Sequence, residues 1–441
     1  MEPISTRQII WRSIFFILTL ITTTIAGAQL MFGDIFTEKG ELLPFEKILQ
    51  GLHFSLPLLA VLTVHEFGHF FTARYYKLDV SLPLYIPFPN FIGTAGAFIR
   101  LNTAPHSRKE YFDVGVAGPV AGFVAALILL FYAFTHLPPP EYIYTIHPEY
   151  AAFGPDFAAH AYPGKSVIAL NGGLLFNFFA EYVAPAGSMP HPYELMHYPY
   201  VVAGFIGLLI TGMNLLPIGQ LDGGHVVYGL LGNARHRIVA PVAMVLIVLW
   251  AGLGVAQPLD LHRMNDAFFN TLWQDTVYLA VLYFTFRKIT PSLQTNLLIA
   301  LSVFTIQYSV ALALPAWHGY SAWLLFMLLL GVLLGVYHPK ALYDQPLDTG
   351  RKAVGWFAIA IFIVCVTPAP IDPFNLDDKG NRVDPGIFGP AEQQQSEPVA
   401  KPGNVQAAMP FGNGQNTGIY LIRSNAYNKA AIKNIKNPDI I

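Results

Sequence analysis

The sequence predicts an all-α polytopic membrane protein with about nine transmembrane helices and a small re-entrant β-hairpin. Of its 441 residues, 54% are hydrophobic and only 12% are charged, whereas soluble domains carry about 25% charged residues. Apolar runs of roughly 20 residues, the length that crosses a bilayer, recur along the chain. The net charge of −2 excludes a strongly basic surface for nucleic acid. The predicted surroundings are therefore a lipid bilayer, with no nucleic-acid partner.

Nine segments are predicted to span the membrane as helices. They are residues 13–31, 53–75, 114–134, 200–216, 238–255, 271–286, 293–314, 322–336 and 353–367. The first run is predicted to be a retained helix, because it is long for a signal peptide. A further stretch, 167–183, is interrupted by Asn171, Asn177 and Glu181, and is predicted to be an interfacial or partly buried helix.

Basic residues predict the orientation, because they concentrate in cytoplasmic loops. Arg7 and Arg12 place the N-terminus inside, and the loop 135–199, with Lys165 as its one basic residue, falls outside. Four regions follow from composition: a leading helix and connection (1–52), a core with the unusual polar residues at membrane depth (53–236), five accessory helices (237–370), and a polar, disordered tail (371–441).

The second predicted span contains the motif His65-Glu66-Phe67-Gly68-His69. In an α-helix, residues four apart lie on one face about a turn apart, so both imidazoles can bind one zinc ion. The adjacent Glu66 is predicted to act as general base on a zinc-bound water. His and Glu side chains inside a membrane helix indicate a functional site, predicted about 15 Å below the cytoplasmic surface.

A catalytic zinc needs a third protein ligand, and Asp222 is the best candidate. It follows Asn214 in a segment where Pro217 breaks the helix and several glycines permit irregular backbone. Asn214 is predicted to donate a hydrogen bond to the substrate, or to join two helices. His225 is predicted to support the site without binding the metal.

The segment 82–101 is too short and too rich in proline for a spanning helix, so it is predicted to form a hairpin that dips into the membrane. Its proline-free part, 93–99, could pair with an extended substrate by strand addition. Gly93 and Gly96 are therefore predicted to bind substrate. The outside loop holds His136, His147, His160, His191 and His197, whose spacings predict solvated side chains and no metal site.

These motifs resemble the site-2 protease family of intramembrane metalloproteases, peptidase family M50. The resemblance rests on the motif at 65–69, on Asn214-x-x-Pro217-x-x-x-x-Asp222-Gly223, and on the hairpin segment 93–98. The segments 116–119 and 216–224 look closest to the branch that includes the chloroplast EGY proteins and their bacterial relatives, as do 338–348 and 367–371.

The resemblance implies a zinc metalloendopeptidase that cuts transmembrane segments of membrane proteins in regulated intramembrane proteolysis. It assigns one zinc ion to His65, His69 and Asp222, the general base to Glu66, and substrate contact to Asn214. The N-terminus lacks a long Ser/Arg-rich stretch typical of a transit peptide. A bacterial cytoplasmic membrane is therefore expected, with the active site near the cytoplasmic side.

Three alternatives stay open at this point. A prenyl-protein-type membrane protease would use Glu as the third ligand, whereas Asp222 is the carboxylate found at membrane depth. A metal-dependent transporter would show repeat symmetry, which is not visible. A proteolytically silent, zinc-containing membrane binding protein would share the whole motif.

Overall fold

Each of the nine predicted spans lies on a helix of the structure, a computed structural model that describes residues 5–33, 40, 42–259, 266–377 and 382–383. Within these residues, five helical segments are long and apolar enough to cross a membrane. They are α1 (Thr6–Phe32), the segment Phe45–Tyr75 that joins α2 (Phe45–Gln50) to α3 (Leu52–Tyr75), α4 (Arg108–Thr135), α10 (Asn233–Ala251) and α12 (Leu293–Ala313). The chain is therefore an integral membrane protein.

The other four predicted spans are helical but do not meet both requirements, so nine crossings are not established. Helix α8 (Pro199–Asn214), α14 (Thr349–Cys365), and α13 (Ala322–Leu329) with its π-helical continuation Leu330–Leu334 are shorter than a typical span, and α11 (Asp266–Phe286) is less apolar. Short helices inside a membrane are tolerated where neighbouring protein surrounds their ends.

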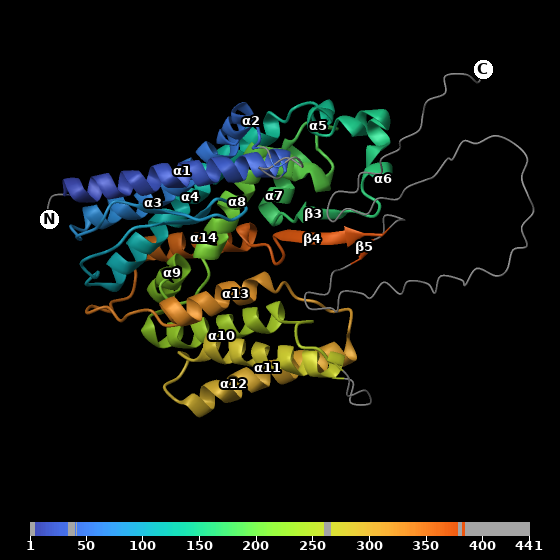
Figure 1. Cartoon of the computed structure of the whole chain (residues 1–441). Helices are drawn as coiled ribbons and strands as arrows, with labels where there is room; N and C mark the ends of the chain where they lie inside the picture. Colours follow the sequence, from blue (N-terminus) through green and yellow to red (C-terminus); the bar gives the residue numbers. More distant parts are fainter. Residues whose placement is uncertain (1–4, 34–39, 41, 260–265, 378–381, 384–441) are drawn as a thin grey trace, which may run out of the picture. The chain divides into compact units, whose positions relative to one another are not determined.

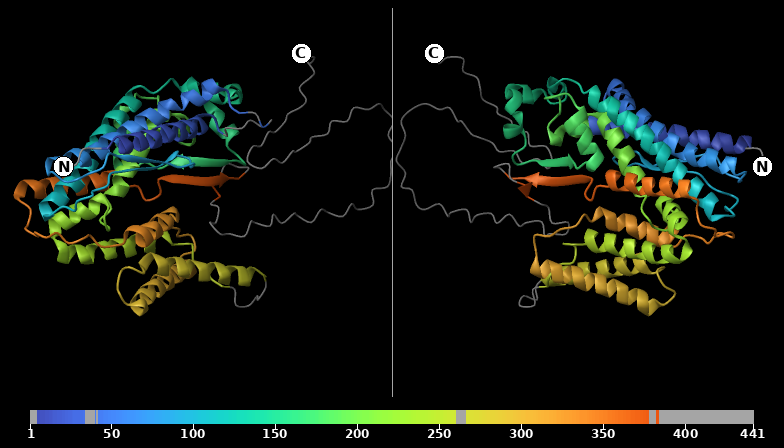
Figure 2. Two further views of the ribbon diagram at one scale, coloured as in Figure 1. Left: turned by 60° about the vertical axis from the view of Figure 1, so that its left-hand side comes forward. Right: turned by 180° about the vertical axis from the view of Figure 1, so that it is seen from behind.

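A first hydrophobic core joins α3, α4 and α8 with α14. Its completely buried side chains include Phe54, Leu58, Leu130 and Phe134, and Ala358 on α14 belongs to the same cluster. Helix α1 lies beside α3 (Figures 1 and 2). The accessory helix α14, predicted from sequence to belong to a separate group, thus packs on the core.

A second hydrophobic core is formed by α10, α11, α12 and α13. Helices α11 and α12 lie side by side in it (Figure 1). Leu216 and Ile218, which follow α8 in the chain, are buried in this cluster. The accessory helices therefore pack on the irregular segment that links α8 to α9 (Asp222–Leu231).

The predicted hairpin is present: β1 (Leu84–Pro87) pairs antiparallel with β2 (Thr94–Phe98). A second sheet has the strand order β3-β4-β5, with β3 Ser166–Leu170, β4 Ile371–Leu376 and β5 Arg382–Val383. The predicted helix over 167–183 is wrong in its first part, because β-branched Val167 and Ile168 lie in β3. Only α7 (Leu174–Phe178) and the π-helical turn Phe179–Val183 are helical there.

Most of the predicted tail, from 384 onward, lies outside the described residues. The chain divides into two compact units, one of residues 1–151 and 169–372 and one of 152–168 and 373–441. All spans and every predicted site residue belong to the first unit. Besides α7 and the π-helical turn, the 135–199 loop contains α5 (Ile143–Ile146), α6 (Phe157–Ala161) and four 3₁₀ turns, of which Pro192–His197 is the last.

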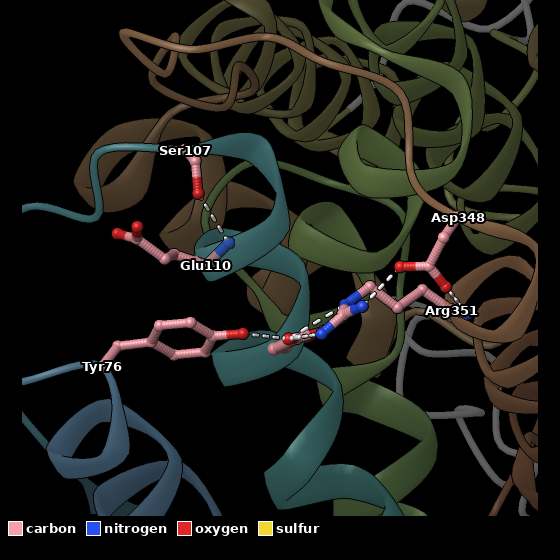
Figure 3. A network of polar contacts seen from close by, with 6 residues as sticks. Tyr76, Ser107, Glu110, Asp348 and Arg351 are labelled. Carbon is pink, nitrogen blue, oxygen red and sulfur yellow. Dashed lines mark hydrogen bonds and ion pairs between the residues drawn. The ribbon is translucent and has the colours of Figure 1, made fainter.

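A polar network fixes the ends of α3, α4 and α14 to one another (Figure 3). The Arg351 guanidinium donates to both carboxylate oxygens of Asp113, with its Nε at 2.8 and 3.0 Å, and it also pairs with Asp348. The Tyr76 hydroxyl donates to the same Asp113 carboxylate. Burial and the bond to Asp113 raise the pKa of Tyr76 to about 12, so this hydroxyl keeps its proton at neutral pH.

We expect Arg351→Ala to lower the free energy of unfolding by about 1–3 kcal/mol, because it removes a two-pronged, charge-assisted pair and leaves the half-buried Asp113 without its cation. Thermal unfolding of the detergent-purified chain measures this. Lys352→Ala is the matched control, since Lys352 is exposed. Equal melting temperatures for the two variants would contradict a structural role for the network.

Candidate metal centre

Helix α3 carries the predicted histidines and glutamate on its buried side. His65, Glu66 and His69 are only 3%, 4% and 7% exposed, although each side chain is polar. A buried ionisable group is unfavourable unless another group compensates for its lost hydration. These three residues therefore require partners from elsewhere in the chain.

Asp222 reaches the two histidines from the start of α9. The preceding segment, 215–221, is irregular, as predicted from Pro217 and the glycines. Gly219 has a φ of +60°, and a β-carbon at Gly223 would lie 1.9 Å from the carbonyl oxygen of Leu215. The chain thus folds back tightly after α8. Asp222 lies in the first turn of α9, where a carboxylate is favoured by the helix dipole.

The three predicted ligands meet with a geometry that fits one metal ion. Oδ2 of Asp222 lies 3.2 Å from Nε2 of His65 and 3.3 Å from Nε2 of His69, and the two Nε2 atoms are 3.2 Å apart. A tetrahedron with metal–ligand distances of about 2.0–2.1 Å has edges of about 3.3–3.4 Å. The three donor atoms therefore already form one face of the coordination shell that zinc prefers.

The protonation state of His69 also fits a metal ion held by the three donor atoms. Its Nδ1 lies 2.7 Å from the carbonyl oxygen of Val114, and a carbonyl only accepts hydrogen bonds, so Nδ1 carries the proton. Nε2 then presents a lone pair to Nε2 of His65 and to the Asp222 carboxylate. Electron pairs that converge in this way are stabilised by a positive charge between them, and a metal ion supplies it. Histidines that bind metals are held by such a backbone carbonyl on the other ring nitrogen.

The small-residue face of α4 makes room for these imidazoles. Gly115, Gly118 and Gly122 lie on one face of α4, and a β-carbon at Gly118 would come within 2.0 Å of Nε2 of His69. One at Gly122 would lie 2.9 Å from Nδ1 of His65. The small-residue face of α4 therefore touches the predicted ligands themselves.

A cavity of about 210 Å³ opens beside the donor atoms. Glu66 lines it, and among the described residues its Oε2 is buried without a hydrogen-bond partner. Asn214 also lines the cavity, with its amide nitrogen 3.3 Å from Nε2 of His65. A carboxylate, an amide and the three predicted metal ligands thus line one space large enough for water and a peptide group.

The hairpin contributes other residues to this cavity than the two glycines predicted from sequence. Ala97, Phe98 and Ile99 line it. Gly93 is buried against α1, where its carbonyl accepts a hydrogen bond from Thr22 at 2.6 Å. Gly96, with a φ of +100°, lies in open space outside the cavity lining. Substrate contact by Gly93 and Gly96 stays a prediction.

His225 supports the site from α9, as predicted. It lines the cavity, its ring packs on Gly115, and its Nδ1 lies 2.6 Å from Nε2 of His338. His338 was not identified as a site residue from sequence, because it lies more than 100 positions further on. Val114 was missed as well, since its contribution is a backbone carbonyl.

Comparison with known proteins identifies this part of the chain. The family model of peptidase family M50 matches residues 53–253, a range that includes both donor segments and the hairpin. Residues 53–253 belong to peptidase family M50. The family predicted from the sequence motifs is thereby confirmed.

Among curated proteins, one similar to this chain is the probable zinc metalloprotease EGY1, chloroplastic, of Oryza sativa subsp. japonica. The two are 31% identical over 193 residues, and this alignment covers 44% of this chain and 30% of the relative. It is 28% identical over 206 residues to the probable zinc metalloprotease EGY2, chloroplastic, of Arabidopsis thaliana, covering 47% and 33%. The matched part thus spans about a third of the length of these relatives. No solved structure matches the chain.

We expect Gly118→Ala to reduce the metal content of this M50 site, because the new β-carbon would displace the His69 ring. Elemental analysis of the purified protein measures the metal content. We expect the affinity for zinc to fall by at least about tenfold. Gly350→Ala is the matched control: it is another helical glycine, where the nearest atom lies 3.4 Å from the added carbon. Full metal content in Gly118→Ala would contradict the packing argument.

Proposed function

We propose that this chain is a zinc metalloendopeptidase of the site-2 protease type, which cuts transmembrane segments of membrane proteins inside the bilayer. The observation that carries the proposal is a triangle of two imidazole nitrogens and one carboxylate oxygen, 3.2–3.3 Å on each side. Its two histidines lie on a helix long and apolar enough to cross a membrane, next to a glutamate with one unpartnered oxygen. The M50 match and the EGY relatives, whose names describe them as probable zinc metalloproteases, support it.

His65, His69 and Asp222 would hold the zinc ion. Bound there, zinc lowers the pKa of water and polarises a carbonyl group. Glu66 supplies the base: the residue lines the cavity, and its Oε2 has no hydrogen-bond partner among the described residues, so the carboxylate can accept the proton of an attacking water. The same carboxyl group can then pass that proton to the leaving amine.

Asn214 and the hairpin would position the substrate. The Asn214 amide lies at the cavity wall, where it can donate to the carbonyl oxygen under attack. Ala97, Phe98 and Ile99 continue from β2 along the same cavity, so an extended substrate can lie against this part of the hairpin. Proteolysis needs such an extended backbone, because a helix hides its peptide bonds in its own hydrogen bonds.

The depth of the site favours a substrate within the membrane. His65 lies ten residues before the end of α3 at Tyr75, which corresponds to about 15 Å along the helix. A peptide bond in a transmembrane segment can reach this depth. The cytoplasmic orientation and a bacterial membrane stay predictions from sequence, and the relatives named above are chloroplastic plant proteins.

The buried glutamate argues against the two non-enzymatic alternatives. A transporter or a silent zinc protein needs the three ligands but has no use for an additional carboxylate that is 4% exposed and lacks a partner for one oxygen. Leaving such an oxygen unsatisfied is unfavourable by about 1–3 kcal/mol. A role as proton acceptor explains why a carboxylate occupies this buried position.

We expect Glu66→Gln to keep its zinc and to slow cleavage of a transmembrane substrate by about 10²–10⁴-fold, because the amide cannot accept a proton. Asp222→Asn should instead lose zinc. Cleavage assays in vesicles and elemental analysis measure the two quantities. Glu181→Gln, at an exposed carboxylate, is the matched control. Retained cleavage in Glu66→Gln would refute the general-base role, and full zinc in Asp222→Asn would refute the ligand assignment.

We expect Ala97→Phe to impair substrate turnover without loss of zinc, because the larger side chain would project into the cavity beside Glu66. Ala95→Phe, at an exposed position of the same strand that does not line the cavity, is the control. Kinetics with a transmembrane peptide and the zinc content together test this. Unchanged turnover in Ala97→Phe would place the substrate elsewhere.

A further inference from the structure

A second group of metal-binding side chains lies in the loop between α4 and α8. His147, Glu194 and His197 bring three potential donor atoms within 4.8 Å of one another. The sequence-based expectation of solvated histidines is wrong for this pair: the His147 and His197 side chains are 29% and 16% exposed, and that of Glu194 is 4% exposed. From these residues we propose a second binding site for a divalent transition-metal ion.

Local structure explains why the three side chains converge. Glu194 and His197 belong to the 3₁₀ turn Pro192–His197, in which side chains three residues apart are aligned. His147 caps the C-terminal end of α5. The two histidines are 50 residues apart in the sequence, so no short motif contains both. The fold places them side by side.

The distances fit a small metal ion. Nε2 of His197 lies 3.2 Å from Nε2 of His147 and 3.2 Å from Oε2 of Glu194, and the third side of the triangle is 3.8 Å. Two of these values lie near the edge of about 3.3–3.4 Å of a zinc tetrahedron, and the third is about 0.4–0.5 Å longer. Two imidazoles and one carboxylate favour zinc or a similar transition metal over magnesium or calcium, which prefer oxygen ligands.

The contacts of the Nδ1 atoms direct the Nε2 atoms of His147 and His197 toward the centre of the cluster. Nδ1 of His197 donates to the carbonyl oxygen of Met31 at 2.8 Å, so Nε2 carries no proton in the neutral ring. Nδ1 of His147 lies 3.4 Å from the Glu149 carboxylate. His69 shows the same arrangement with Val114.

The proposed ion would link the loop between α4 and α8 to the ends of α1 and α8. Met31 is near the end of α1, His197 directly precedes α8, and His147 follows α5. The M50 centre lies at the other end of α8, which is 16 residues or about 24 Å long. In Figure 1, α5 and the end of α1 lie at one end of the helix array and α9 at the other. The second site is therefore separate from the first.

The test uses the full chain in detergent, stripped with a chelator and then titrated with Zn²⁺ alone. We expect about two zinc ions per wild-type chain and about one in His65→Ala/His69→Ala, where only the loop site remains. His147→Ala/His197→Ala should also bind about one, and the control His136→Ala, at an exposed loop histidine, about two. Elemental analysis counts the ions.

A second measurement covers the case in which a loop variant fails to fold. In His65→Ala/His69→Ala, whose loop is intact, Zn²⁺ should raise the melting temperature, while Mg²⁺ should not. Adding Glu194→Gln to this background should weaken zinc binding by at least about tenfold. The proposal is overturned if the wild type binds one zinc ion and His65→Ala/His69→Ala binds none, because the loop cluster would then hold only protons.

Discussion

The close packing of α3 against α4 is the constraint on which the metal centre depends. A β-carbon at Gly68 would lie 2.6 Å from the carbonyl oxygen of Ala117, so the two backbones are nearly in contact. The next residue of α4, Gly118, leaves the space that the His69 ring fills. Apolar side chains give helices no preference for each other over lipid, and small residues that allow close approach drive their packing. In this chain the same glycines that pack the helices also determine where the ligands lie.

The position of Asp222, the predicted third ligand, depends on a different part of the molecule. This part is the connection Gly335–Asp348, which joins the group α10–α13 to α14. The amide of Gly219 donates to the carbonyl of Val336 at 2.9 Å, and His338 contacts His225. The Asp344 carboxylate lies 3.4 Å from Nη1 of Arg108, at the start of α4. This connection touches the irregular segment before Asp222, then α9, then α4. It gives the accessory helices a structural role, because their anchoring fixes the backbone that carries Asp222.

Sequence reasoning succeeded where a regular helix links residue spacing to geometry. The separation of His65 and His69 by four residues predicts one face of a helix, and the segment 82–101, too short and too rich in proline for a spanning helix, predicts the hairpin. It failed where position depends on backbone conformation. Gly93 packs on α1 because of the turn it occupies, and Val167 joins a strand that pairs with a segment about 200 residues further along the chain. Contacts such as that of His225 with His338 depend on chain packing over long sequence separations.

The two donor clusters use the same physical arrangement on different backbones. In each, an imidazole donates one ring hydrogen to a backbone carbonyl and directs its other nitrogen to a shared centre, where a carboxylate completes the set. The histidines of the first cluster are spaced for an α-helix, so a motif reveals them. Those of the second depend on a 3₁₀ turn that aligns Glu194 with His197 and on a distant loop. Because the clusters lie at opposite ends of α8, metal ions at both would restrain this helix at each end, and with it Asn214 at the wall of the cavity.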